Sequence, residues 1–101
     1  MNSEIINKVK SVVLNFDKNA QVILFGSRAR GDEKPASDWD FLIITSFPVD
    51  EKKKRELRDQ LFYTELETNQ VISSVVYFKD YWESYKVTDL YQNITKEGVI
   101  I

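Results

Sequence analysis

Four residues in the first half of the chain have types and a spacing that suit phosphate and metal chemistry. Gly26 and Ser27 follow one short apolar run, and Asp38 and Asp40 open the next, with ten residues between the two pairs. Because side chains alternate along a strand, Asp38 and Asp40 are expected on one face, close enough to share a cation. The pattern predicts a phosphate-binding turn beside a carboxylate pair, as nucleoside triphosphate chemistry requires.

The residues around the Gly-Ser pair match the needs of a bound polyphosphate. Gly26 lets the backbone approach a phosphate without a Cβ in the way. Ser27 adds a hydroxyl and an N–H at a helix start, where the helix dipole favours an anion. Arg28 and Arg30 can neutralise phosphate oxygens as charge develops on a leaving pyrophosphate. We therefore predict that Gly26, Ser27, Arg28 and Arg30 bind the nucleotide.

The two aspartates are predicted to be both metal ligands and catalytic residues. Mg²⁺ usually takes one or two carboxylates plus substrate phosphates, and two such ions can orient an attacking oxygen and stabilise a leaving group. Each feature alone also fits an ordinary turn or an exposed strand end, and it is the combination at this spacing that favours a site. Trp39 faces away from both aspartates by alternation and is interpreted as a core anchor rather than an adenine platform.

Composition narrows the classes of function. The 101 residues, 43% of them hydrophobic, fit a single domain over residues 1–101. A net charge of −2 argues against broad nucleic-acid binding. The absence of cysteine and histidine excludes disulfides, zinc–thiolate sites, Cys or His nucleophiles and a histidine base. With no secretory or long apolar segment, no membrane association and a cytoplasmic location are expected.

Apolar spacing and turn residues predict an α/β order, α-β-α-β-α-β-α. The expected elements are a helix from an N-cap at Ser3 to Phe16, a strand over 21–25, a brief helix over 28–30, a strand over 39–45, a long helix capped by Asp50, a strand over 71–78, a short helix opened by a capping box at 80–83, and a last helix stopped by Gly98.

The long helix after Asp50 has a charged start and an apolar continuation. Its expected buried stripe is Leu57, Leu61, Phe62 and Leu66. Its first turns, residues 51–58, are densely charged and include a run of four cations at 52–55, but pairs such as Glu51–Arg55, Lys52–Glu56 and Arg55–Asp59 have i,i+4 spacing. We interpret these turns as a solvated face with internal ion pairs rather than as a phosphate patch.

The stretches Phe25-Gly26-Ser27-Arg28-Ala29-Arg30-Gly31 and Ser37-Asp38-Trp39-Asp40-Phe41-Leu42-Ile43 carry a family resemblance over essentially the whole chain. The chain resembles the minimal nucleotidyltransferases of the DNA polymerase β-like superfamily. This group includes kanamycin nucleotidyltransferase-like enzymes and antitoxins paired with HEPN toxins. The tail Leu90–Val99 also looks like the usual end of these domains. The resemblance implies a small mixed sheet flanked by helices, phosphates held by Gly26 and Ser27, Mg²⁺ held by Asp38 and Asp40, and transfer of AMP from ATP to a hydroxyl.

One position departs from the family pattern. Active members usually carry a third acidic residue in the strand after the long helix, where this chain has Ser73 and Ser74. A serine neither ligates Mg²⁺ comparably nor acts as a base at neutral pH. Glu65 and Glu67 precede the strand and are the candidates to substitute for this acid, although a helix stop is the simpler interpretation of both.

Three functions remain open at this point. The first is Mg²⁺-dependent AMP transfer to a partner protein, as an antitoxin paired with a HEPN-type toxin. The second is a binding module without chemistry that masks its partner, and the third is transfer to a small hydroxylated molecule. Since enzymes of the third kind usually carry a further domain for the acceptor, a HEPN-type partner or a homodimer is expected. The apolar tail Val99-Ile100-Ile101 is a candidate contact.

Overall fold

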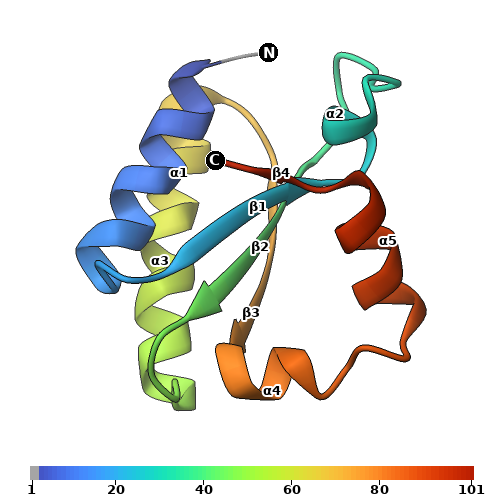
Figure 1. Ribbon diagram of the computed structural model, residues 1–101. Coiled ribbons are helices and arrows are strands. Elements are labelled where there is room, and N and C mark those ends of the chain that lie inside the picture. Colours follow the sequence, from blue (N-terminus) through green and yellow to red (C-terminus); the bar gives the residue numbers. More distant parts are fainter. Residues whose placement is uncertain (1–2) are drawn as a thin grey trace.

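The structure, a computed structural model, describes residues 3–101 and the side chains from Glu4 onward; the expected N-cap of Ser3 lies outside the described side chains. A four-stranded mixed sheet of order β3-β2-β1-β4 lies between helices on both faces (Figure 1). The elements are α1 Ser3–Phe16, β1 Gln21–Phe25, α2 Ser27–Arg30, β2 Trp39–Thr45, α3 Glu51–Thr68, β3 Ile72–Phe78, α4 Lys79–Glu83, α5 Asp89–Glu97 and β4 Val99–Ile100. The predicted mixed sheet flanked by helices is confirmed.

The two strands that carry the predicted site are the central strands of the sheet. β1 pairs antiparallel with β2, which places Phe25 opposite Asp40. β2 pairs in parallel with β3, which places Asp40 beside Ser73. Because β2 has a neighbour on each side and helices on each face, its nearly continuous apolar sequence is buried, as expected of a central strand.

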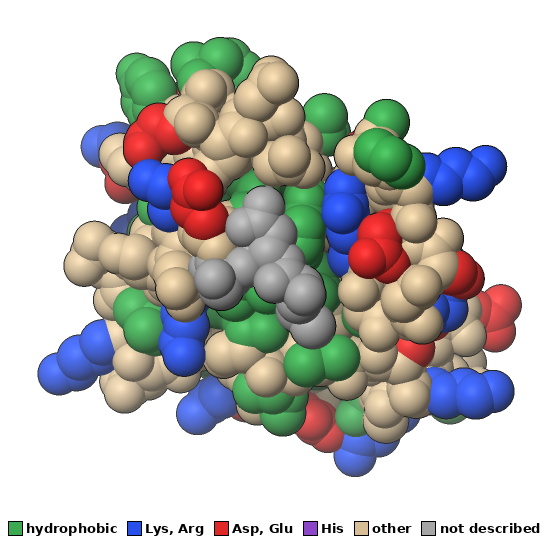
Figure 2. Space-filling model, turned by 90° about the horizontal axis from the view of Figure 1, so that it is seen from above, with side chains coloured by type: hydrophobic (Ala, Val, Ile, Leu, Met, Phe, Trp, Pro, Cys, Tyr) green, Lys and Arg blue, Asp and Glu red, His purple; other side chains and the backbone are tan. Residues whose placement is uncertain are grey.

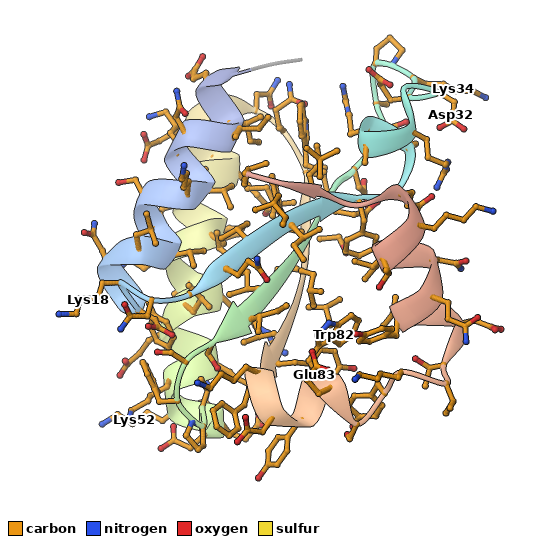
Figure 3. All side chains as sticks on the ribbon, viewed as in Figure 1. Lys18, Asp32, Lys34, Lys52, Trp82 and Glu83 are labelled. Carbon is orange, nitrogen blue, oxygen red and sulfur yellow. The ribbon has the colours of Figure 1, made fainter. Side chains whose placement is uncertain are left out.

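The core lies on both sides of the sheet, and the two sides are built by different helices. On one face α1 and α3 cover the inward side chains of β1 and β2, among them Trp39, which is 2% exposed. On the other face α4 and α5 place Trp82 and Ile94 against Leu42. The Trp82 ring lies between the sheet and α5 (Figure 3), with ring centroids 5.4 Å from Tyr77 and 4.8 Å from Tyr91. Asp40 and Leu42 share this second face.

The buried stripe of α3 differs from the prediction. Leu57, Leu61 and Thr64 are buried, whereas Phe62 is 55% and Leu66 64% exposed. Successive helical residues turn by about 100°, so residues four and seven positions after Leu57 share its face, whereas Phe62 and Leu66 point away from it. The charged first turns are largely exposed, as predicted. None of the three expected i,i+4 pairs is among the ion pairs formed by residues 4–101.

The start of α4 and the C-terminal tail also differ from the prediction. The expected capping box at 80–83 does not form, because the chain passes from β3 directly into α4 at Lys79 and Asp80 lies inside the first turn. The tail, not expected to be a strand, forms β4 on the free side of β1, with Val99 opposite Leu24. Ile101 packs against the core while Ile100 stays 67% exposed. No helix within residues 3–101 is long and apolar enough to cross a membrane.

Candidate functional site

The predicted site lies where β1 ends and β2 begins. Gly26 has φ 74° and ψ −159°, a conformation that glycine alone adopts readily, and the half-buried Ser27 starts α2 immediately after it. A Cβ on Gly26 would lie 3.0 Å from Cγ of Asp40 and closer still to its Oδ2. The bare backbone of the turn and the carboxylate of Asp40 are therefore in direct contact.

Several charged side chains act on the carboxylate of Asp40. Asp40 is half-buried and Asp38 is exposed. Burial raises the pKa of Asp40 above its ordinary value, and the negative charges of Asp38 and, more weakly, Glu97 raise it further, while Arg30 opposes them. A group crowded by carboxylates in this way gains most from a bound cation.

Asp38 and Asp40 fit a magnesium ion because they are two carboxylates at alternate positions, and one of them is partly desolvated. Their negative charges repel each other, and a bound cation would relieve that repulsion. Among the described residues, no group of three or more acidic, histidine or cysteine side chains is arranged to hold a metal.

Arg30 lies on the site side of α2, together with a residue that the sequence analysis did not single out. Its Nη1 is 3.1 Å from Oε2 of Glu97, and its Nε is 3.2 Å from Oδ2 of Asp32. The other oxygen of Glu97 accepts a hydrogen bond of 3.3 Å from the Gly26 N–H. Figure 2 looks down on this end of the molecule and shows acidic and basic side chains side by side over α2. The only sequence signal for Glu97 is its place beside Gly98 in the tail that resembles the family.

Arg28 does not join the other predicted site residues. Its guanidinium carbon lies 4.6 Å from the centre of the Trp39 ring, and its Nη2 donates to the carbonyls of Pro35 and Ser37 at 3.2 and 2.9 Å. Since Trp39 and Asp40 point to opposite faces of β2, Arg28 holds the loop after α2 rather than facing Asp40. The Trp39 indole N–H donates to Gln70 at 3.1 Å, in agreement with its predicted role as a core anchor.

The position expected for a third acid is occupied by Ser73, which shares the face of Asp40, whereas Ser74 pairs with the buried Phe41 on the other face. The two glutamates before the strand have structural partners. Glu65 accepts a hydrogen bond of 2.7 Å from the Ile72 N–H, and Glu67 forms an ion pair with Lys8 at 2.9 Å.

A comparison with protein families shows to which family the chain belongs. The family model of the nucleotidyltransferase domain matches residues 4–101. The chain belongs to the nucleotidyltransferase domain family. The comparison with curated proteins finds no match for it.

Two solved structures share the fold of this nucleotidyltransferase domain. One is a chain of a toxin–antitoxin crystallised with AMP-PNP, with a TM-score of 0.68 and 21% identity over 93% of this chain and 69% of that one. The other is a chain of a toxin–antitoxin MntA-HpeT mutant in which two aspartates are replaced by glutamate. Its TM-score is 0.65 and its identity 18%, with the same coverage of both chains.

Proposed function

We propose that residues 1–101 act as a single domain that transfers AMP from Mg²⁺-bound ATP to a hydroxyl of a partner protein. The observation that carries the proposal is the contact between the Cβ-free turn at Gly26 and the Asp40 carboxylate. This contact brings backbone donors for phosphate next to an oxygen ligand for a cation.

In the proposed reaction, the acceptor oxygen forms a bond to the α-phosphorus of ATP, and the bond from that phosphorus to the bridging oxygen of pyrophosphate breaks. Asp38 and Asp40 would hold Mg²⁺, which would supply charge neutralisation for the phosphates. Gly26 and Ser27 hold phosphate oxygens, and Arg30 neutralises charge on the leaving pyrophosphate. The hydroxyl proton passes to a base of the acceptor or to solvent, because Ser73 cannot take it.

The comparisons support a protein as the acceptor. Both structural neighbours come from toxin–antitoxin structures, one of them with a nucleotide analogue and the other altered at two aspartates. A HEPN-type toxin is therefore the partner that we propose. A second candidate function, masking of that partner without chemistry, is favoured by one observation: Ser73 stands beside Asp40 where the third acid is expected.

Incubation with labelled ATP, Mg²⁺ and the protein encoded beside this gene tests the proposal. We expect label on that protein, and no label when Asp40 is replaced by Asn. Mg-ATP should also raise the melting temperature of the intact domain, since a ligand that binds only the folded state stabilises it. A tight complex without label, unaffected by Asp40→Asn, would establish the masking function instead.

A further inference from the structure

Glu97 occupies the groups that the proposed function assigns to phosphate. It is the last residue of α5 and lies 71 residues from Gly26 in the sequence. One of its oxygens accepts from the Gly26 N–H at 3.3 Å, and the other contacts Arg30 at 3.1 Å. Its side chain is 22% exposed. A carboxylate that bridges a backbone amide and a guanidinium takes the place that a phosphate oxygen would take.

The position of α5 does not depend on this contact. Ile94 is buried against the sheet, and the Gly98 N–H closes the end of the helix on the Ile94 carbonyl at 2.7 Å. The chain then continues into β4, which pairs with Ile23 and Leu24 of β1. Packing and backbone hydrogen bonds already fix the end of α5, so the Glu97 carboxylate is available for another role.

We propose that Glu97 is a resident anion of the phosphate turn, displaced by the incoming polyphosphate, and that it makes the site selective for polyphosphates over a single phosphate. This inference rests on the proposed function. Like charges at hydrogen-bonding distance repel, and the carboxylate already occupies the two donors, so the carboxylate and a phosphate cannot share Arg30 and the Gly26 N–H. A triphosphate has several phosphate groups that can contact the site at once and displace Glu97, whereas inorganic phosphate has one.

Arg30 stays largely in position when Glu97 leaves. Arg30 keeps its second partner, Asp32, at 3.2 Å. Exposed ion pairs contribute little to stability, so the pairing of Arg30 with Glu97 does little to hold the guanidinium in place. Removing the negative charge of Glu97 should therefore strengthen anion binding rather than weaken it.

Glu97→Gln tests this inference because the amide oxygen can still accept from the Gly26 N–H while the charge is lost. Its matched control is Glu83→Gln, which also removes a glutamate from a surface ion pair, with Lys86 at 3.0 Å. Glu83 lies at the end of the molecule opposite the loop of Asp32 and Lys34 (Figure 3). Calorimetric titrations with Mg-ATP, inorganic pyrophosphate and inorganic phosphate give the dissociation constants. The melting temperature checks that both variants are folded.

We expect Glu97→Gln to bind Mg-ATP and pyrophosphate at least about threefold more tightly than the intact protein, with a smaller preference over phosphate, and Glu83→Gln to bind like the intact protein. The Gly26 amide resonance should shift in the intact protein when pyrophosphate is added. Equal or weaker binding by Glu97→Gln, with the intact protein binding Mg-ATP, overturns the role of Glu97 and leaves the proposed function standing. No binding of Mg-ATP by either protein overturns both.

Discussion

Asp40 on β2 and Ser73 on β3 are direct neighbours in a parallel pair of strands, with their side chains on the same face of the sheet. This pairing shows that Ser73, rather than Ser74, is the serine beside Asp40, at the position where the family resemblance leads us to expect an acid. Ser74, one residue on, lies on the face covered by α1 and α3.

Replacing Ser73 by Asp should raise the rate of AMP transfer. A positioned base contributes about a hundredfold or more, so a rise of about tenfold is the least we expect from a carboxylate next to Asp40. The rate of label transfer from ATP, at saturating Mg²⁺, measures the effect. Ser74→Asp is the control: its charge would be placed beside the buried Phe41, where it should destabilise the fold and leave the rate no higher. Equal rates for the intact protein and Ser73→Asp would show that the serine is not what limits turnover.

Gly26→Ala should destabilise the protein more than Gly31→Ala. Both glycines have positive φ, 74° and 82°, but a Cβ at Gly31 meets nothing within 4 Å, whereas at Gly26 it collides with Asp40. We expect a loss of about 1 kcal/mol at Gly31, the cost of the left-handed region for alanine, and about 2–3 kcal/mol at Gly26. Urea unfolding of the two variants compares them directly, and equal losses would contradict the contact with Asp40.

Asp40→Asn should keep or slightly raise the stability of the metal-free protein, by less than about 1 kcal/mol. Because the folded pKa of Asp40 is raised, the folded state retains its proton in a pH range where the unfolded chain has lost it. Ionisation of Asp40 therefore lowers the stability of the folded protein as pH rises from the ordinary pKa of the group, 3.8, through its raised folded pKa. The loss of stability persists at neutral pH. Unfolding curves from pH 3 to 8 should show that part of the slope disappear in the variant.

The same variant, and Asp38→Asn, should lose the part of the melting-temperature shift that depends on Mg²⁺ when ATP is added. If either substitution instead unfolds the protein, the aspartates are structural residues and the metal assignment falls.

Asp17→Asn should destabilise the protein at neutral pH by about 1–3 kcal/mol. The buried Asp17 carboxylate accepts from the Ser46 N–H and O–H, each at 2.7 Å, and from the Asn19 N–H at 3.0 Å. Burial acts to raise its pKa, but these donors together hold the pKa below its ordinary value, 3.8. Its stabilisation is therefore complete above that value and is lost as pH falls through the lowered folded pKa. The gap between Asp17→Asn and the intact protein should shrink in acid, while the exposed Asp59→Asn should change little at any pH.

The positions of β1, β2 and β3 could be predicted from the sequence, as could the placing of the Gly-Ser pair at the end of β1 and of the Asp-x-Asp pair at the start of β2. These features depend on local alternation and turn chemistry. Phe62 and Leu66 could not be placed, since an apolar side chain next to the true stripe of α3 has the same local pattern whether it is buried or exposed. Glu97 was missed for a different reason. Its partners, Gly26 and Arg30, lie far away in sequence, and the end of α5 reaches the turn through tertiary contacts, the packing of Ile94 and the pairing of β4 with β1.

The antiparallel pairing of Phe25 with Asp40 means that the chain leaves the sheet and returns to it at adjacent points. The distance between the Gly26 turn and the Asp40 carboxylate is thus fixed by the hydrogen bonds between β1 and β2. The residues that connect these two strands form a loop whose ends are held together. Arg28 holds this loop at Pro35 and Ser37, Arg30 contacts Asp32, and the Lys34 N–H donates to the Ser37 hydroxyl, so the exposed Glu33 lies at the tip between these contacts. Loop-closure entropy grows only slowly with length, by about 0.6 kcal/mol per doubling, so residues inserted at that tip should leave the site intact. The tip of the ten-residue interval is then a permissive position, and a domain or a label could be inserted there without disturbing the register that brings Gly26 to Asp40.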